Sequence, residues 1–494
     1  MIYVGFDQLH KDYGALAKAD PKKDLIVFVE SERMISGRKW HKQRLWFLLA
    51  SVKNFQADLR EKGFEVIHLK APNTLAGLVT LKDKYNISTI QAATPNSYRL
   101  KDSLSKLVQY SENDFFLTTE AEFQSWASSQ KKMLMENFYR NQRIKFNILM
   151  EGNQPAGGKW NYDHENRGFP DEDYEFPKYL KHQPNEIDLE VWNEIENSGL
   201  DLWGEDLDGT WGTTRKSAKK QLDHFLKYNL SNFGPFEDAM LTDNWSLHHS
   251  LLSPYLNNGL LHPLEVVAAV SKKYQSGEIP IQSAEGFIRQ VIGWREYVRG
   301  AYWYLGEGYR NENQLHYQKK LLPLFHHPEK TNMNCLSTIV KDISKRSWVH
   351  HIPRLMVLSN LALLTGINPQ VFLNWMREVF IDAADWVMVP NVIGMGMHAD
   401  GGKMMTKPYI AGGSYISKMS NYCGDCKYNP KLRVGENACP FTSLYWNFLA
   451  ENKDKFSKNP RMFQQFSGMK KLSDLAETQD RAKEVIQGLV KGTI

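Results

Sequence analysis

The sequence predicts an α/β N-terminal domain, built on a doubly wound parallel sheet, and a large all-α C-terminal domain. Up to about residue 125, short β-branched apolar runs alternate with helical stretches, which is the pattern of a parallel sheet. Beyond about residue 210 the apolar residues follow helical spacing almost throughout. The length of 494 residues exceeds what one core usually supports. We therefore expect an α/β domain at 1–125, a linker at 126–208 and a helical domain at 209–494.

The predicted sheet begins at the N-terminus. Leu25 to Val29 is β-branched and uninterrupted, which is typical of a strand buried on both faces. From His41 to Lys62 the apolar residues fall at helical spacing, and Gly63 ends that helix. The predicted strands lie at residues 1–7, 25–29, 64–69, 89–92 and 115–117.

The segment 126–208 predicts a linker because it is rich in proline and glycine, with some helix at about 130–150. It contains the acidic run Asp171–Glu172–Asp173, which favours a solvated loop over a magnesium site. Four helices are predicted in the C-terminal domain, at 266–274, 284–304, 349–364 and 369–382.

The composition narrows the class of protein. The net charge of +5 permits contact with a polyanion, although only clustering on one face would indicate it. No uncharged apolar run reaches about 18 residues, so we expect no contact with a membrane. The N-terminus lacks the basic and apolar segments of a signal peptide, which predicts a cytoplasmic protein. We also expect a monomer.

The four cysteines all lie in the helical half, at Cys335, Cys423, Cys426 and Cys439. Cys423 and Cys426 form a C-x2-C pair that can hold one metal centre, with the two distant cysteines completing its coordination. Unrelated buried thiols and a structural zinc are the alternatives. Zinc sites usually combine two such pairs, whereas the other two cysteines here are single, and this favours a cubane iron–sulfur cluster.

Three further motifs follow in the helical half. Ser250 and Ser253 precede a helix that Pro254 can begin, and hydroxyls at a helix N-terminus suit a pyrophosphate. Gln290, Trp294 and Tyr297 share one helical face that can stack on an extruded base. Taken singly, the first motif is as well explained by an ordinary capped helix, and the second by a core aromatic stripe.

The third motif runs from Arg346 to Arg354 and contains His351. A histidine in a pocket can donate a proton near neutral pH, while an arginine beside a buried carboxylate more often has a structural role. A single histidine is itself more often structural. The motif therefore indicates a function only in combination with the other motifs of the chain.

Together these motifs resemble the photolyase/cryptochrome family in residues, order and spacing. His249-Ser-Leu-Leu-Ser-Pro-Tyr-Leu is similar to the flavin-phosphate loop of that family, with His249 in place of a threonine. Pro155 to Arg167, Pro390 to Met395, Thr406 to Tyr409 and the four cysteines narrow the resemblance to the iron–sulfur bacterial branch.

The resemblance implies FAD in the helical domain, a 4Fe–4S cluster near it, and a 6,7-dimethyl-8-ribityllumazine antenna in the N-terminal domain. It implies light-dependent repair of UV-damaged DNA, with an electron passing from reduced flavin to a flipped lesion. Gln290 and His351 stand where enzymes acting on cyclobutane dimers usually have glutamate and asparagine. The resemblance therefore favours (6–4) photoproducts as substrate. Leu355 replaces a second histidine of animal enzymes, which leaves His351 alone as proton donor.

The remaining assignments also come from the resemblance. It implies that Asp382 pairs with Arg354 and that His327, Met376 and Ala384 interrupt the usual aromatic relay to the flavin. Met34 stands where an antenna-binding glutamate is expected. The implied flavin contacts are Ser250, Ser253, Arg295, Arg354, Asp382 and Asn391. The residues implied to line the lesion cavity are Trp294, Tyr409 and Tyr415, and the implied electron-transfer residues are Trp375 and Trp386. The implied antenna contacts are Asp7, Gln8, Glu30 and His41.

Two alternatives to repair stay open. A cryptochrome-like photosensor would hold the same cofactors but release a signal instead of repaired DNA. An iron–sulfur nucleic-acid-binding module, similar in kind to the primase large subunit, would lack the flavin. The presence of His351 and Gln290 favours repair. Magnesium bound near the acidic run is a further possibility for DNA contact.

Overall fold

The structure, a computed structural model, describes residues 1–494, and its N-terminal part is a five-stranded parallel sheet with strand order β4-β2-β1-β5-β6. Strand order reverses at β1, so the sheet is doubly wound, as predicted. β2 and β4 pair in register from Leu25 with Glu65 to Ser31 with Ala71. The strands are β1 (Ile2–Tyr3), β2 (Leu25–Ser31), β4 (Glu65–Ala71), β5 (Ile90–Ala93) and β6 (Val108–Ser111).

One predicted strand is wrong. Residues 115–117 form no strand, and the fifth position in the sheet belongs to β6. Phe115 and Phe116 are buried among residues of the helical part, where the guanidinium of Arg295 lies 4.0 Å from the ring centroid of Phe116. A short apolar run looks alike in a buried strand and in a buried loop, and the contacts that distinguish them are tertiary.

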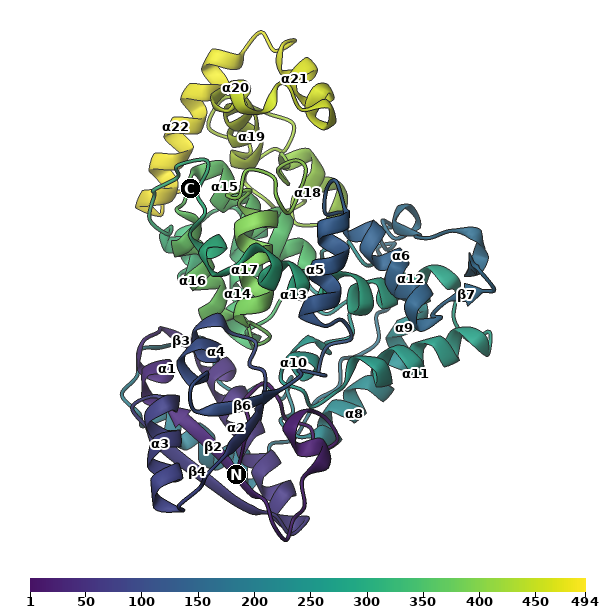
Figure 1. Cartoon of the computed structure of the whole chain (residues 1–494). Coiled ribbons are helices and arrows are strands. Elements are labelled where there is room, and N and C mark those ends of the chain that lie inside the picture. The colour runs from purple at the N-terminus through teal and green to yellow at the C-terminus, as the bar shows by residue number, and fades with distance from the viewer.

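Helices follow the strands and cover the sheet (Figure 1). The predicted helix at 41–62 is confirmed as α2, and its residues at helical spacing, such as Leu45 and Leu49, are buried. The helices that follow β2, β4, β5 and β6 are α1 (Glu32–Ser36), α2 (Lys42–Glu61), α3 (Thr74–Lys84), α4 (Tyr98–Leu104) and α5 (Glu120–Ser129). The last of these, α5, does not cover the sheet but packs against α13 (Glu296–Leu305) in the helical part.

The segment after α5 runs back along the α/β domain. The indole Nε1 of Trp46 on α2 donates to the carbonyl of Asp188 on α7 at 2.9 Å, and β9 pairs in parallel with β3. α6 lies on the right of Figure 1 and packs against residues 289–295 of the helical part, so this segment touches both parts of the molecule. The strand β3, which lies in the α/β domain, comprises Trp40–His41. The elements of the segment itself are α6 (Met135–Phe146), β7 (Met150–Glu151), β8 (Gln154–Pro155), α7 (Glu186–Glu196) and β9 (Leu202–Trp203).

The remainder is helical, as the apolar spacing predicted, and carries the C-terminus at the top of Figure 1. No helix is both long and apolar enough to cross a membrane. The helices are α8 (Arg215–His224), α9 (Leu230–Phe233), α10 (Ser253–Asn257), α11 (Pro263–Gln275), α12 (Ile281–Ile288), α13 (Glu296–Leu305), α14 (Asn334–Arg346), α15 (Asn360–Thr365), α16 (Pro369–Val379), α17 (Asp385–Val389), α18 (Gly413–Met419), α19 (Pro440–Glu451), α20 (Lys453–Phe456), α21 (Phe463–Met469) and α22 (Leu475–Lys491).

Three π-helical turns interrupt this regular pattern within the sequence motifs. They are η5 (Arg289–Arg295), η9 (Pro353–Ser359) and η10 (Pro390–Gly396). π-Helical turns are rare and occur often at functional sites because they redirect side chains that an α-helix would place elsewhere. η9 and η10 pack against each other, and α13 packs against η10. The motifs therefore converge in space.

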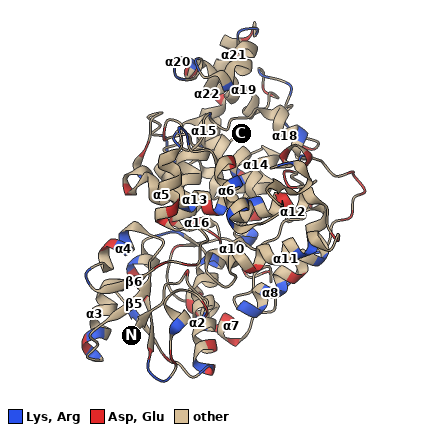
Figure 2. Cartoon of the chain, turned by 45° about the vertical axis from the view of Figure 1, so that its right-hand side comes forward, with Lys and Arg blue, Asp and Glu red and all other residues tan.

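Charge does not gather on the face seen in Figure 2, where Lys and Arg are interspersed with Asp and Glu.

One apolar core runs from the sheet through α6 and α7 into the helical part, because Phe28, Trp192 and Ile288 belong to the same buried cluster. The boundaries at 125 and 208 therefore stay predictions.

Candidate functional site

The carboxylate of Asp382 is the centre of a buried polar network. Arg354 donates to its two oxygens at 2.9 and 3.1 Å, and the Ser253 hydroxyl donates to it at 2.6 Å. Both partners of the ion pair are largely buried, so they hold each other in a fixed geometry. The pairing of Asp382 with Arg354 predicted from the sequence is confirmed. This network fixes the start of α10 against the loop after α16.

Arg295 lies on the other side of α10. It donates to Glu296 at 2.9 Å and to the backbone oxygen of Leu256 at 3.2 Å, and burial lowers its pKa to about 10. The side chains of two other predicted flavin contacts make only local bonds. Ser250 accepts from its neighbour Leu252, and Asn391 donates to Val387 one turn earlier in its helix.

Several buried polar atoms in this region have no partner in the chain. They include Nε of Arg295, Nε2 of His249, Nδ1 of His350 and the indole nitrogen of Trp386. A buried polar group without a partner costs stability, so such a group generally meets a ligand or water. Donors and a hydroxyl at the start of α10 fit the polar parts of a dinucleotide such as FAD.

Three histidines meet beside this network. The rings of His249 and His350 stack with centroids 4.3 Å apart, and the ligand nitrogens of His249, His350 and His351 lie within 4.8 Å of one another. Burial holds the pKa of His249 and of His350 well below the usual value, so both are neutral.

His351 differs from its two neighbours. Its side chain is 47% exposed, and its Nε2 lies 3.4 Å from the Asp238 carboxylate. Desolvation opposes its charge, but the hydrogen bond to Asp238 and the charge of that carboxylate outweigh it, and the pKa of His351 is raised. A half-exposed imidazole whose pKa is raised is suited to donate a proton.

Gln290 reaches the same place from η5. Its side-chain nitrogen donates to Glu237 at 2.6 Å, and Asn166 of the linker donates to the other oxygen of that carboxyl at 3.1 Å. Burial raises the pKa of Glu237 to about 7, against the opposing charge of Arg289. Because Glu237 and Asp238 are adjacent, they bring Gln290 and His351 together.

The predicted lesion-cavity tyrosines lie around this carboxylate pair. Burial raises the pKa of Tyr415 to about 12, and the charge of Asp238 adds to this effect. The pKa of Tyr409 is raised by burial and, to a smaller degree, by Asp163 of the linker. Asp163 in turn accepts from Arg289 at 3.1 Å. The linker motif thus provides one wall of the site.

The helical face predicted to carry Gln290, Trp294 and Tyr297 forms only in part. Trp294 is half-buried beside Tyr297, with ring centroids 6.1 Å apart. Tyr297 is 1% exposed and packs against Phe123, Trp126 and Phe138, so it belongs to the core and not to a base-stacking face. The prediction for Tyr297 is therefore wrong.

The two predicted electron-transfer tryptophans are both buried. Trp375 lies 6.1 Å from Phe380, and the guanidinium of Arg354 lies 4.0 Å from that ring, so Trp375 connects to the Asp382 network through one phenyl group. Trp386 meets the ring of Phe116 edge to face at 4.9 Å.

The four cysteines converge and are free of disulfides. Burial raises the pKa of Cys335 well above its usual value, and the other three thiols add to the effect, which shows that they are neighbours. A tetrahedral zinc brings its sulfurs within about 3.8 Å of one another. Four neighbouring thiols can hold either a zinc ion or, at a wider spacing, a 4Fe–4S cluster.

The predicted antenna residues do not form one group. The Asp7 carboxylate accepts from Asn96 at 2.9 Å, and Gln8 donates to the backbone oxygens of Ala93 and Thr94 at the end of β5. Glu30 instead pairs with His68 at 3.0 Å. His41 donates to the carbonyls of Ile343 and Ser344 near the end of α14, so the structure uses it as a contact between the two parts of the chain. The acidic run at 171–173 is exposed.

Sequence reasoning missed Glu237, Asp238, Asn166 and Arg289 as members of the site. The signal was available for the first two, because an adjacent acidic pair follows Phe236 in an otherwise apolar stretch. Asn166 and Arg289 stand inside quoted motifs, yet only the folded chain shows that they converge on carboxylates.

Comparisons with known proteins agree with this architecture. Residues 2–211 match the family described as "Deoxyribodipyrimidine photo-lyase-related protein". The chain is 39% identical to the (6-4) photolyase of Agrobacterium fabrum over 98% of both chains. Its fold is similar to a class III photolyase from Agrobacterium tumefaciens, with a TM-score of 0.62 at 16% identity, covering 99% of this chain and 97% of that one. It is also similar to a cryptochrome from Synechocystis, with a TM-score of 0.56 at 13% identity and 98% coverage of both.

Domain architecture, the motifs in the helical half and the full-length relative lead to the same assignment. The chain belongs to the photolyase/cryptochrome family.

Proposed function

We propose that this protein is a (6–4) photolyase, an enzyme that uses light to reverse (6–4) pyrimidine–pyrimidone photoproducts in UV-damaged DNA. The observation that carries the proposal is one cluster in which His351, paired with Asp238, and Gln290, paired with Glu237, lie beside the Arg354–Asp382 pair. The name and the full-length identity of the Agrobacterium relative support the same activity.

The cofactors of the proposed enzyme follow from the donor sets. Ser250, Ser253, Arg295, Asn391 and the Arg354–Asp382 pair would hold FAD, which in its reduced form supplies light absorption and an electron. The four cysteines would hold a 4Fe–4S cluster. A ribityl-lumazine antenna would lie at the carboxyl ends of the strands near Asp7 and Gln8. We retain residues 1–125, 126–208 and 209–494 as the corresponding domains.

His351 is the proposed proton donor. Moving a hydroxyl or oxygen between two bases needs a proton at the departing group, and the half-exposed imidazole of His351 can deliver it. The charge of Asp238 raises the pKa of this imidazole and so favours its protonated form. The buried His249 and His350 stay neutral and pack against it, which fixes the orientation of the ring.

Gln290 is the proposed reader of the flipped base. Its amide is oriented by Glu237, which leaves the remaining polar atoms of the amide free to bond a base edge. Trp294, Tyr409 and Tyr415 are half-buried and would exclude water around the lesion. Trp375 and Trp386 would carry electrons that keep the flavin reduced.

The test is repair of defined oligonucleotides under blue light. Purified protein is mixed with duplexes that carry one (6–4) photoproduct or one cyclobutane dimer, then illuminated or kept dark, and the products are separated by liquid chromatography. The proposal predicts intact pyrimidines from the (6–4) duplex in the light only. Repair of the dimer alone would overturn the substrate, and no light-dependent product from either duplex would favour a photosensor.

A further inference from the structure

A cavity of about 370 Å³ lies between the α/β domain and the helical domain. Its walls come from α1 and the loop after it, the start of α4, the end of α13 with the turn behind it, α16 and α17. The volume is at the lower end of the range of about 300–1,000 Å³ for small-molecule sites. The lining is mostly polar. Three of its side chains are acidic (Glu307, Glu378 and Asp385) and five are arginines: Arg33, Arg38, Arg99, Arg310 and Arg377.

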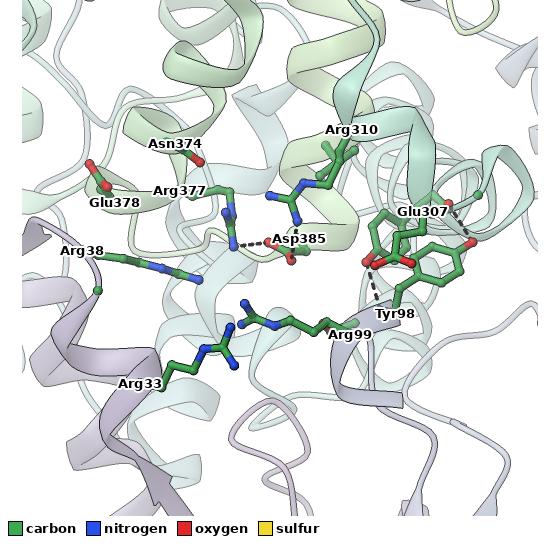
Figure 3. A pocket seen from close by; sticks show the side chains of 15 residues that line it. Arg33, Arg38, Tyr98, Arg99, Glu307, Arg310, Asn374, Arg377, Glu378 and Asp385 are labelled. Carbon is green, nitrogen blue, oxygen red and sulfur yellow. Dashed lines mark hydrogen bonds and ion pairs between the residues drawn. The ribbon is translucent and has the colours of Figure 1, made fainter. Parts of the chain in front are cut away.

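The positive charge of this cavity is only partly neutralised. Arg377 pairs with Asp385 at 2.6 Å, and Arg310 lies 4.0 Å from the same carboxylate. Arg33, Arg38 and Arg99 have no ion pair, although their guanidinium groups point toward the same space in Figure 3. Burial, followed by repulsion from Arg377, lowers the pKa of Arg38 to about 10. Glu378 offsets part of the charge of Arg38, but the five arginines outnumber the three carboxylates of the lining, and this excess of positive charge favours an anion.

The cavity also stands where the sheet topology predicts a ligand. The strand order reverses at β1, and in doubly wound sheets the crevice at the carboxyl ends of the strands at such a point is the usual ligand site. Arg33 follows β2, and Arg99 follows β5, the two neighbours of β1. Charge and topology therefore point to the same place independently.

The antenna residues implied by the sequence do not line this cavity: Asp7, Gln8, Glu30 and His41 lie elsewhere. A ribityl chain carries no charge, so lumazine would leave the three guanidiniums without partners. We propose that the cavity binds the phosphate monoester of a mononucleotide-sized ligand, with the phosphate held by Arg33, Arg38 and Arg99. This site goes beyond the proposed repair function and does not depend on it.

An aromatic wall favours a ring at the other end of the ligand. Tyr98 and Tyr302 both line the cavity, and their ring centroids are 5.1 Å apart. The hydroxyl of Tyr98 donates to the backbone oxygen of Tyr302 at 3.3 Å, which holds the phenol ring in place. Guanidiniums at one end and fixed aromatic rings at the other match a phosphate carried on a nucleoside-like group.

Isothermal titration calorimetry of the full chain with its cofactors bound, in the dark, tests the proposal. The probes are 5′-AMP and flavin mononucleotide, each compared with the same molecule lacking the phosphate, adenosine and riboflavin. We expect at least one phosphorylated probe to bind at least tenfold more tightly than its partner. The Arg33→Gln/Arg99→Gln double variant should weaken that probe tenfold or more and leave the unphosphorylated one unchanged.

Arg60→Gln is the matched control, because Arg60 is an exposed arginine on α2 that does not line the cavity. It should bind the probe as the unmodified protein does. Equal affinity with and without the phosphate, or an equal loss in the control, overturns the proposal. Displacement of the probe by undamaged duplex DNA, with the same dependence on Arg33 and Arg99, overturns it in favour of a contact with the DNA backbone. Light-dependent repair is measured separately, so the two proposals fail independently.

Discussion

Replacing Glu237 with glutamine should make the protein more stable at alkaline pH and leave it nearly unchanged at acid pH. Glu237 is buried, and burial raises its pKa from 4.5 to about 7. A raised carboxyl pKa means that the folded chain binds the proton more tightly than the unfolded chain does. The stability that this proton contributes is fully present below pH 4.5 and is lost as the pH rises through about 7.

The magnitude follows from the two pKa values. One pKa unit corresponds to about 1.4 kcal/mol, so complete ionisation of the buried carboxyl costs about 3 kcal/mol. Glutamine resembles the protonated carboxyl and stays neutral. Between pH 5 and pH 8.5 the stability advantage of Glu237→Gln over the unmodified protein should therefore grow by about 2.5 kcal/mol.

The assay is urea unfolding of the flavin-loaded protein at those two pH values. Glu172→Gln, which changes an exposed carboxylate in the linker, is the control and should show no such growth. Gln290 donates to Glu237, so the variant should also lose repair activity through misplacement of that amide. A difference between variant and unmodified protein that does not change with pH would refute the burial argument.

Three further changes test other parts of the structure. Gly286→Ala should lower the melting temperature, with a cost of about 1–3 kcal/mol, because a Cβ there would lie 2.6 Å from the side-chain nitrogen of Asn166. Gly308→Ala is the control, since a Cβ at that position meets open space and should have little effect. Arg354→Met leaves the Asp382 carboxylate buried without its partner, so the free energy of unfolding should fall by about 3–5 kcal/mol. The purified variant should also show little flavin absorbance. Unchanged flavin content would contradict the proposed flavin site. Cys423→Ser should remove most iron and acid-labile sulfide from purified protein, and a full iron count would argue against this cysteine as a ligand.

Much of the fold could be predicted because local patterns decide it. The β-branched run at 25–29 and the helical spacing after His41 each became the element expected. Residues 115–117 failed because their burial comes from Arg295 and the helical core, which no local pattern encodes. Short apolar runs are ambiguous for this reason.

The candidate site divides in the same way. The Arg354–Asp382 pair was predictable from motif resemblance, since both residues stand at recognisable positions. The acidic pair at Glu237 and Asp238 was visible in the sequence, but its role was not, because that role depends on contacts with Gln290 and His351 from other elements. Tyr297 was misplaced because helical spacing gives the shared face but not what packs against it, and the helix contains the π-turn η5.

The most direct test of the account is the repair yield of His351→Asn on the (6–4) duplex under blue light, at flavin content equal to that of the unmodified protein. Loss of a positioned proton donor costs about 10²–10⁴-fold, so the account predicts a loss of at least a hundredfold. Asp238→Asn should move the pH limit of repair to lower values, because it removes the charge that raises the pKa of His351. Undiminished repair by His351→Asn would contradict the account.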